Sequence, residues 1–176
     1  TSSGARYKNH NYLRNTVLNA SFSDGNPVTG GSNLLTTHAF YVNDVDNVMI
    51  EGNEVNTLAG ACVFARDVSG IRVTNNRWQN NNWYTVNFAS DVKHFTISNN
   101  EFISGTAYGA VIRLQSVVNV LVQNNKISGI DNTASGAEIT GIAVTTRGTS
   151  SSNKNSPSEN VRIIGNYLEG PSNISN

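Results

Sequence analysis

Polar and apolar positions follow a unit that recurs along most of the chain. The unit places an apolar residue three positions before an asparagine and another two positions after it. Successive asparagines lie 23, 24, 25 and 41 residues apart, and they are Asn53, Asn76, Asn100, Asn125 and Asn166. A period in the low twenties with short apolar segments is typical of a solenoid, in which each repeat forms one coil.

Each asparagine is preceded by two apolar residues with one residue between them. Period-two spacing puts both side chains on the same side of a strand, facing inward. The pairs are Val48/Ile50, Ile71/Val73, Phe95/Ile97, Val120/Val122 and Val161/Ile163. A second apolar segment runs earlier in each unit, and a third, shorter one begins after the asparagine. With no helical period, the pattern predicts an all-β parallel β-helix, a solenoid of about six coils with three short strands per coil. An antiparallel sandwich would need hairpin turns, and it would not explain the recurring asparagine.

The repeat also suggests boundaries. Residues 1–12 are polar and aperiodic, residues 13–170 are predicted to form the β-helix domain, and residues 171–176 a tail. Val17–Phe22 fits the unit with Ala20 in the asparagine position, so we interpret it as a degenerate first coil. Insertions enlarge some coils at residues 23–37, 128–140 and 147–158. Such insertions often form the binding face of a repeat protein.

Stacked asparagines have a structural interpretation. Coils repeat at about 4.8 Å, so equivalent amides can hydrogen-bond in a column. The residue after each asparagine alternates in charge, as Glu54, Arg77, Glu101 and Lys126. Neighbouring coils would then place opposite charges side by side, each pair contributing about 0.2–1 kcal/mol. These residues are therefore assigned to the scaffold.

The surface carries few charges. Lys+Arg and Asp+Glu both number 12, and charged residues make up 14% of the chain. We therefore expect neither nucleic acid binding nor attraction to anionic lipid, and no apolar run reaches membrane-spanning length. Cys62 is the only cysteine, and His10, His38 and His94 lack metal-ligand spacing. No metal site and no cofactor are expected.

These repeats resemble those of the right-handed parallel β-helices of the pectin-lyase-like superfamily. The resemblance covers roughly residues 13–170. The superfamily includes pectate lyases, polygalacturonases, alginate epimerases and bacteriophage tailspikes, which bind and usually modify long polysaccharides. No diagnostic motif of the alginate epimerases or polygalacturonases is present. The low charge and the abundance of Asn, Ser, Thr and Gly make the chain most similar to tailspike or tail-fibre β-helices, which are typically trimeric.

Three aspartates are the candidate catalytic residues. Asp44, Asp67 and Asp91 occupy the same turn on adjacent coils. Glycoside hydrolysis uses two carboxyl groups about 5–5.5 Å apart for retention or 6.5–9.5 Å apart for inversion. The alternative is structural, since aspartate in a turn commonly hydrogen-bonds its own backbone.

The candidate substrate-binding residues are aromatic or cationic. Trp83 and Tyr84 lie in a turn without apolar period, and aromatic faces stack on sugar rings. Trp78, by contrast, aligns with Val55 and is expected in the core. Arginines at strand ends could hold acidic groups of a glycan or pair with the turn aspartates, and they are Arg66, Arg113 and Arg147.

The sequence therefore predicts a tailspike-like β-helix that binds, and in one version depolymerises, bacterial capsule or O-antigen polysaccharide. Whether the protein is an enzyme is left open. One alternative is a non-catalytic structural or adhesive stalk, and another is a secreted lyase or epimerase. A homotrimer in a virion tail is expected under the first hypothesis, with Tyr41, Phe64 and Phe88 on the interface, and a secreted or cell-surface protein under the others.

Overall fold

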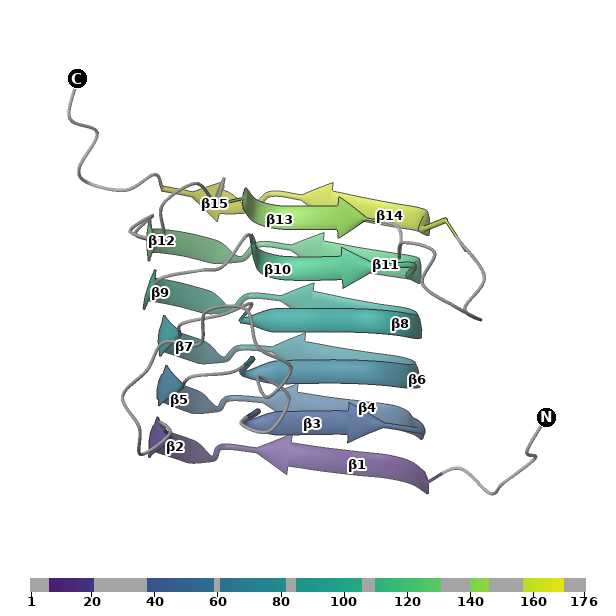
Figure 1. Cartoon of the computed structure of the whole chain (residues 1–176), viewed down its shortest axis with the longest axis horizontal. Helices are drawn as coiled ribbons and strands as arrows, with labels where there is room; N and C mark the ends of the chain where they lie inside the picture. Colours follow the sequence, from purple (N-terminus) through teal and green to yellow (C-terminus); the bar gives the residue numbers. More distant parts are fainter. Residues whose placement is uncertain are drawn as a thin grey trace, which may run out of the picture.

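The structure, a computed structural model, consists of strands stacked in successive coils (Figure 1). It describes residues 7–20, 38–58, 61–81, 85–105, 110–130, 140–145 and 157–169. All strand pairs in these residues are parallel, and each strand pairs with its equivalent one coil away. The predicted all-β architecture with parallel coils is confirmed.

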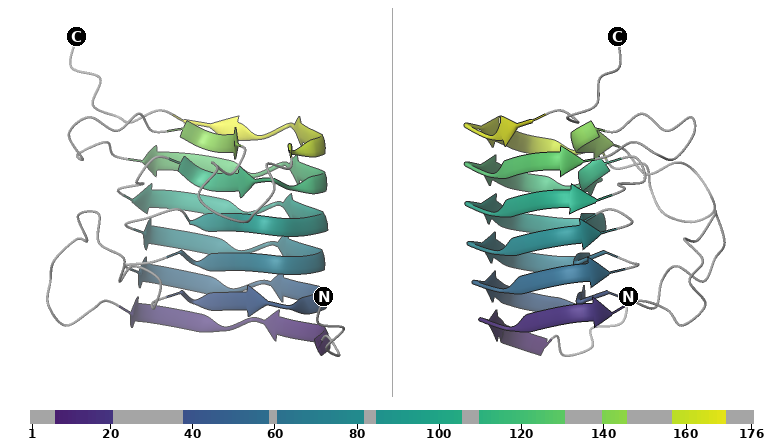
Figure 2. Two further views of the ribbon diagram at one scale, coloured as in Figure 1. Left: turned by 45° about the vertical axis from the view of Figure 1, so that its right-hand side comes forward. Right: turned by 90° about the vertical axis from the view of Figure 1, so that its left-hand side faces the viewer.

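Three faces surround the stack, as the two turned views show (Figure 2). The first face contains β3 (Phe40–Asn43), the first part of β6 (Val63–Thr74), the first part of β8 (Val86–Ser98), β10 (Ala110–Gln115) and β13 (Thr140–Thr145). The second face contains β1 (Tyr7–Leu13), β4 (Val45–Glu51), the remainders of β6 and β8, β11 (Val118–Gln123) and β14 (Glu159–Ile164).

The third face is a separate six-stranded sheet. Its strands are β2 (Thr16–Ala20), β5 (Glu54–Leu58), β7 (Arg77–Asn81), β9 (Glu101–Gly105), β12 (Lys126–Ile130) and β15 (Tyr167–Leu168). In the middle of the molecule, the prediction of three separate strands per coil is too simple. β6 and β8 each run without a break through the corner between the first and second faces.

Backbone turns recur at three places in the coil, each marked by a positive φ. Asp44, Asp67, Asp91 and Ser116 mark the corner between the first two faces, with φ of 50–54°. A second set lies within the second face, and we call it the outer column: Asn9, Asn47, Gly70, His94, Asn119 and Asn160. The third set precedes the recurring asparagines and includes Asn75, Asn99 and Asn124. Asparagine, aspartate and glycine are the residues that tolerate this left-handed conformation best.

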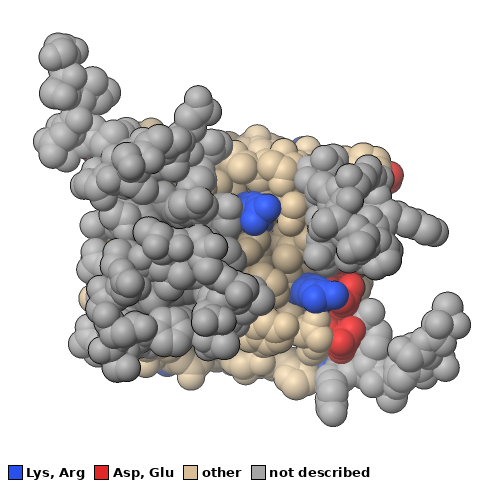
Figure 3. Space-filling view, viewed as in Figure 1, with Lys and Arg blue, Asp and Glu red and all other residues tan. Residues whose placement is uncertain are grey.

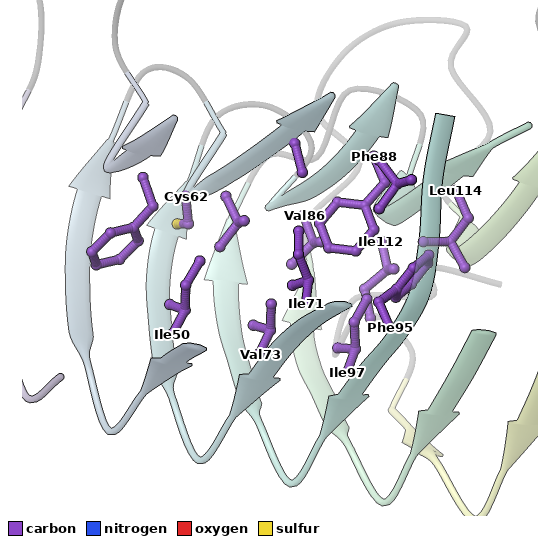
Figure 4. Packing of buried hydrophobic residues seen from close by; sticks show 14 of the residues in the cluster. Ile50, Cys62, Ile71, Val73, Val86, Phe88, Phe95, Ile97, Ile112 and Leu114 are labelled. Carbon is purple, nitrogen blue, oxygen red and sulfur yellow. The ribbon is translucent and has the colours of Figure 1, made fainter. Parts of the chain in front are cut away.

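The interior is a continuous apolar core in which equivalent residues stack coil upon coil (Figure 4). Ile50, Ile71, Val73 and Ile97 from the second face are fully buried, as predicted from their alternation. Trp78 is also fully buried, between the rings of Phe40 and Phe102, so its predicted core position is confirmed. Phe88 points inward against Phe95, at a ring-centroid distance of 4.5 Å. The prediction that Phe88 lies on an outer flank is therefore wrong.

The recurring asparagines form a ladder that is buried along most of its length. Asn76 Oδ1 accepts hydrogen bonds from both the backbone N and Nδ2 of Asn53, each at 2.9 Å. The same pair of bonds joins each member to the next as far as Asn166. The ladder begins at Asn15, whose backbone N and Nδ2 donate to Asn53 Oδ1 at 2.8 and 2.9 Å.

Asn15 corrects the assignment of the first coil. Ala20 was predicted to take the ladder position, but it ends β2 and pairs with Leu58. β1 also lies mostly within residues 7–12, a segment that shows no apolar period. Its inward positions are filled by His10 and Tyr12, which disguise the alternation.

The last described coil exposes positions that are buried in earlier coils. Val144, Ile163 and Leu168 are 40%, 47% and 52% exposed, whereas their partners one coil earlier are at most 2% exposed. Within the described residues, nothing packs over this end of the core. A solenoid coil needs a neighbour on each side to bury its apolar side chains.

Candidate functional site

The outer surface of the first face carries two rows of outward side chains. Alternation along each strand turns these residues away from the core. One row contains Tyr41, Phe64, Asn87, Arg113 and Ala143, and the other begins with Asn43 and Arg66. Figure 3 views this side of the molecule and shows a strip that is mostly uncharged, with basic side chains within it and acidic side chains at its margin. The outward side chains of this strip are mainly aromatic rings and amides, and few of them are charged.

Three stacked rings form the most distinctive feature of this surface. We call His38, Tyr41 and Phe64 the aromatic group. The rings of Tyr41 and Phe64 are nearly parallel and stacked, with centroids 5.3 Å apart and an interplanar angle of 4°. His38 stacks on Phe64 at 4.8 Å and on Tyr41 at 5.8 Å. Phe64 is buried, whereas Tyr41 is 53% exposed. The aromatic group therefore exposes the Tyr41 ring, which is supported by the buried ring of Phe64.

His38 is held as a neutral imidazole. The Ala61 backbone N donates to its Nδ1 at 3.2 Å. Burial lowers the pKa of His38 below its ordinary value of 6.5, because desolvation disfavours the charged form. The aromatic group is consequently uncharged at neutral pH.

Asn87 lies beside the aromatic group, paired in register with Phe64. The residue is only 2% exposed, and its Oδ1 has no hydrogen-bond partner within the described part of the chain. A buried acceptor without a donor costs about 1–3 kcal/mol. Arg113 follows Asn87 in the same row, one coil further along. Of the two residues, Arg113 is partly exposed, whereas Asn87 lies beneath the surface.

The three candidate catalytic aspartates stack at the corner beside this surface. Asp44 and Asp91 are exposed, and all three have positive φ. Asn43 Nδ2 donates to Asp44 Oδ2 at 2.7 Å, and Arg66 Nε lies 3.2 Å from Asp67 Oδ2. The left-handed turn explains why aspartate recurs here, since Ser116 takes the same conformation in the next coil. Their catalytic role stays a prediction.

The structure describes only some of the predicted binding residues. Arg66 and Arg113 project from the first face, in the two outward rows. Arg66 is paired with Asp67, the structural alternative that the sequence left open. Trp83, Tyr84 and Arg147 lie outside the described residues. No sequence pattern indicates His38 or Asn87 as a residue of this surface. Only the outward position of Tyr41 and Phe64 could have indicated this part of the surface.

The alternating charges beside the ladder are confirmed as scaffold contacts. Arg77 lies between Glu54 and Glu101, at 3.5 Å from each, and Lys126 Nζ lies 3.2 Å from Glu101. Within the described residues, no group of three or more His, Cys, Asp or Glu could hold a metal ion. The same residues contain no helix long and apolar enough to span a bilayer.

Comparison with known families identifies the architecture. Residues 3–167 match the family described as right handed beta helix region. No curated protein and no solved structure matches the chain. The matched residues include every described strand except the end of β15. Such a β-helix fits a polysaccharide-related or a structural role. The chain belongs to the right-handed β-helix family.

Proposed function

We propose that the protein binds polysaccharide along the outer surface of the first face. The aromatic group is the observation that carries this proposal. A half-exposed tyrosine backed by a parallel buried ring provides a fixed flat surface, and the apolar face of a sugar ring packs on such a surface. The guanidinium of Arg113, in the same row two coils beyond Phe64, supplies a polar contact. A sugar hydroxyl oxygen can accept from it.

Within this proposal the protein is a phage tailspike-like β-helix, trimeric and located in the virion tail, and its ligand is bacterial capsule or O-antigen. Low overall charge supports this class, as does the exposed Tyr41 on the first face. A secreted or cell-surface location accompanies the alternatives. Light scattering would measure the assembly, with three 18.9 kDa chains expected. A stable monomer would contradict the trimer.

Substitution of Tyr41 tests the binding surface. Tyr41→Ala removes the exposed ring but leaves the core unchanged, and we expect at least about fivefold weaker retention of a bound glycan. Tyr167→Ala is the matched control, because Tyr167 is 57% exposed on the third face. Affinity electrophoresis through gels containing capsular or O-antigen polysaccharides measures the retention. Equal retention by both variants would rule out the aromatic group as the binding surface.

Depolymerisation is a second candidate function, supported by an aspartate in each of three successive coils at the edge of this surface. Asp67 and Asp91 are neighbours one coil apart, about 4.8 Å by the spacing of parallel strands. Asp67→Asn combined with Asp91→Asn keeps side chains that tolerate the positive φ. Release of reducing ends should disappear while retention persists. If the unaltered protein releases no ends from any bound glycan, the non-catalytic adhesive alternative replaces depolymerisation. Release of unsaturated ends would favour the lyase alternative.

A further inference from the structure

A groove of about 520 Å³ crosses the outer surface of the second face, over β1, β4, β6 and β8. It lies away from the aromatic group, on the face behind the first in Figure 1. Its side chains come from two neighbouring rows, the outer column and the row that contains Met49, Arg72 and Thr96. A volume of this size lies within the range of about 300–1,000 Å³ usual for small-ligand sites.

Gly70 interrupts the outer column where the column lines the groove. Gly70 has no side chain, and its φ is +78°. The amide of Asn47 lies over this position, so that a Cβ on Gly70 would be 2.7 Å from Asn47 Oδ1. Between Asn47 and His94 the column therefore has no side chain of its own, and the Asn47 amide covers Gly70. Arg72 borders the groove beside it.

The charge in the groove is one-sided. Arg72 lines it, and none of its lining residues is acidic. Arg72 is exposed, and no carboxylate of the described residues pairs with it. The acidic residue nearest in register is Glu51 on β4, which lies outside the lining and accepts from Asn75 Nδ2 at 3.2 Å. A guanidinium in such a setting can offer its planar pair of donors to a carboxylate.

The hydrogen bonds of the outer column make His94 a further donor. Asn160 Nδ2 donates to Asn119 Oδ1 at 2.9 Å, which leaves Asn119 Nδ2 facing His94 Nδ1 at 3.2 Å. An amide nitrogen only donates, so His94 Nδ1 is the acceptor and the ring proton is on Nε2. His94 Nε2–H, the Arg72 guanidinium and the Thr96 hydroxyl are then donors of the groove, beside the amides of the asparagines that line it.

We infer that this groove is a binding site for a carboxylate-bearing ligand the size of one sugar, such as a sugar acid. Arg72 takes the carboxylate through two N–H groups, His94 and Thr96 bind hydroxyl oxygens, and the Met49 side chain lies against the ring. The site is independent of the aromatic group. It would hold an acidic unit whether or not the first face binds glycan.

NMR titration tests the site with D-glucuronate as the probe, at constant ionic strength. We expect saturable shifts of the Arg72 Nε–H and His94 ring signals, with a Kd of about 1–10 mM if Arg72, His94 and Thr96 act together. D-glucose should shift neither signal, and acetate should bind much more weakly. The His94 ¹⁵N shifts of the free protein should report the Nε2–H tautomer.

Variants separate this site from others. Arg72→Gln should weaken glucuronate binding about tenfold or more. Arg72→Lys should weaken it less, because lysine keeps the positive charge but loses the two parallel N–H donors of the guanidinium. Arg162→Gln is the matched control, since Arg162 lies exposed in the same row, beyond the groove. Tyr41→Ala should leave the glucuronate-induced shifts of the Arg72 and His94 signals unchanged, because the groove lies on another face. Equal affinity for acetate, equal binding by Arg72→Gln, or no saturable shift would overturn the inference.

Discussion

Two columns of stacked polar side chains run along this β-helix, and they use the same residue type differently. The asparagine ladder is continuous, and Asn53, Asn76, Asn100 and Asn125 are at most 2% exposed. Each of its steps has two hydrogen bonds to one oxygen. The outer column is exposed, has single side-chain bonds, and is interrupted at Gly70.

Burial accounts for this difference. A ladder asparagine satisfies backbone groups that water cannot reach, as when Asn76 Nδ2 donates to the Ile50 carbonyl oxygen at 2.9 Å. In the outer column, water can replace any lost partner, so asparagine is favoured there mainly by its tolerance of positive φ. One column therefore admits a single residue type, whereas the other admits Asn, Gly and His. The groove lies along this more variable column.

Asn76→Ala should give the largest effect. It removes the acceptor for Asn53 N and Nδ2 and the donor to the Ile50 carbonyl oxygen, all buried. Unsatisfied buried groups cost about 1–3 kcal/mol each, so we expect a loss of about 3 kcal/mol or more in the free energy of unfolding. Urea denaturation followed by circular dichroism measures it. A loss below about 1 kcal/mol would show that burial does not distinguish the columns.

Gly70→Ala should have the next largest effect. The new Cβ meets Asn47 Oδ1 at 2.7 Å, and alanine at positive φ costs about 1–2 kcal/mol. Gly52→Ala is the control for backbone strain alone, since its φ is +65° and its nearest contact, Arg14 Cγ, is 3.4 Å away. Thermal unfolding should rank Gly70→Ala below Gly52→Ala in stability. The reverse order would indicate that Asn47 moves aside freely.

Glu101→Gln tests the charges beside the ladder. Glu101 contacts both Arg77 and Lys126 through partly exposed side chains, so the loss should be about 0.2–1 kcal/mol. The difference from the unaltered protein should shrink in 1 M salt, which screens exposed ion pairs. If the loss persists at high salt, packing rather than charge is its cause.

Asn119→Gly should have the smallest effect. It removes the bonds to His94 and Asn160 but keeps a residue suited to positive φ, so we expect a change of a few tenths of a kcal/mol. Chemical denaturation beside Asn76→Ala gives the direct comparison. A loss approaching that of Asn76→Ala would mean that the outer column also supports the fold.

The features that depend on the buried asparagine ladder could be predicted from the sequence. The recurring asparagines and the alternating apolar pairs predicted the parallel coils, the buried Trp78 and the alternating charges beside the ladder. Asn15 was missed because a long segment separates it from Asn53 and because His10 and Tyr12 interrupt the apolar pattern of β1. Phe88 was misplaced because β6 and β8 change register between Ala65 and Arg66, which no local pattern shows.

The candidate sites were less predictable for a physical reason. The outer column is defined by backbone conformation, so Gly70 and His94 occupy equivalent positions without resembling each other. The aromatic group joins His38 to Phe64 across two coils, which only the register of stacking brings together. Asp44, Asp67 and Asp91 were visible as a series, but their positive φ accounts for them without invoking chemistry.

The hydrogen-bond lengths of the ladder do not depend on how many residues separate successive asparagines. Asn125 and Asn166 are 41 residues apart in sequence, and their two bonds are 3.0 and 2.8 Å long. Asn53 and Asn76 are 23 residues apart, and both bonds measure 2.9 Å. Loops can therefore lengthen in one coil without transmitting strain to its neighbours. This decoupling gives evolution a scaffold on which the insertions can diversify while the coils remain in register.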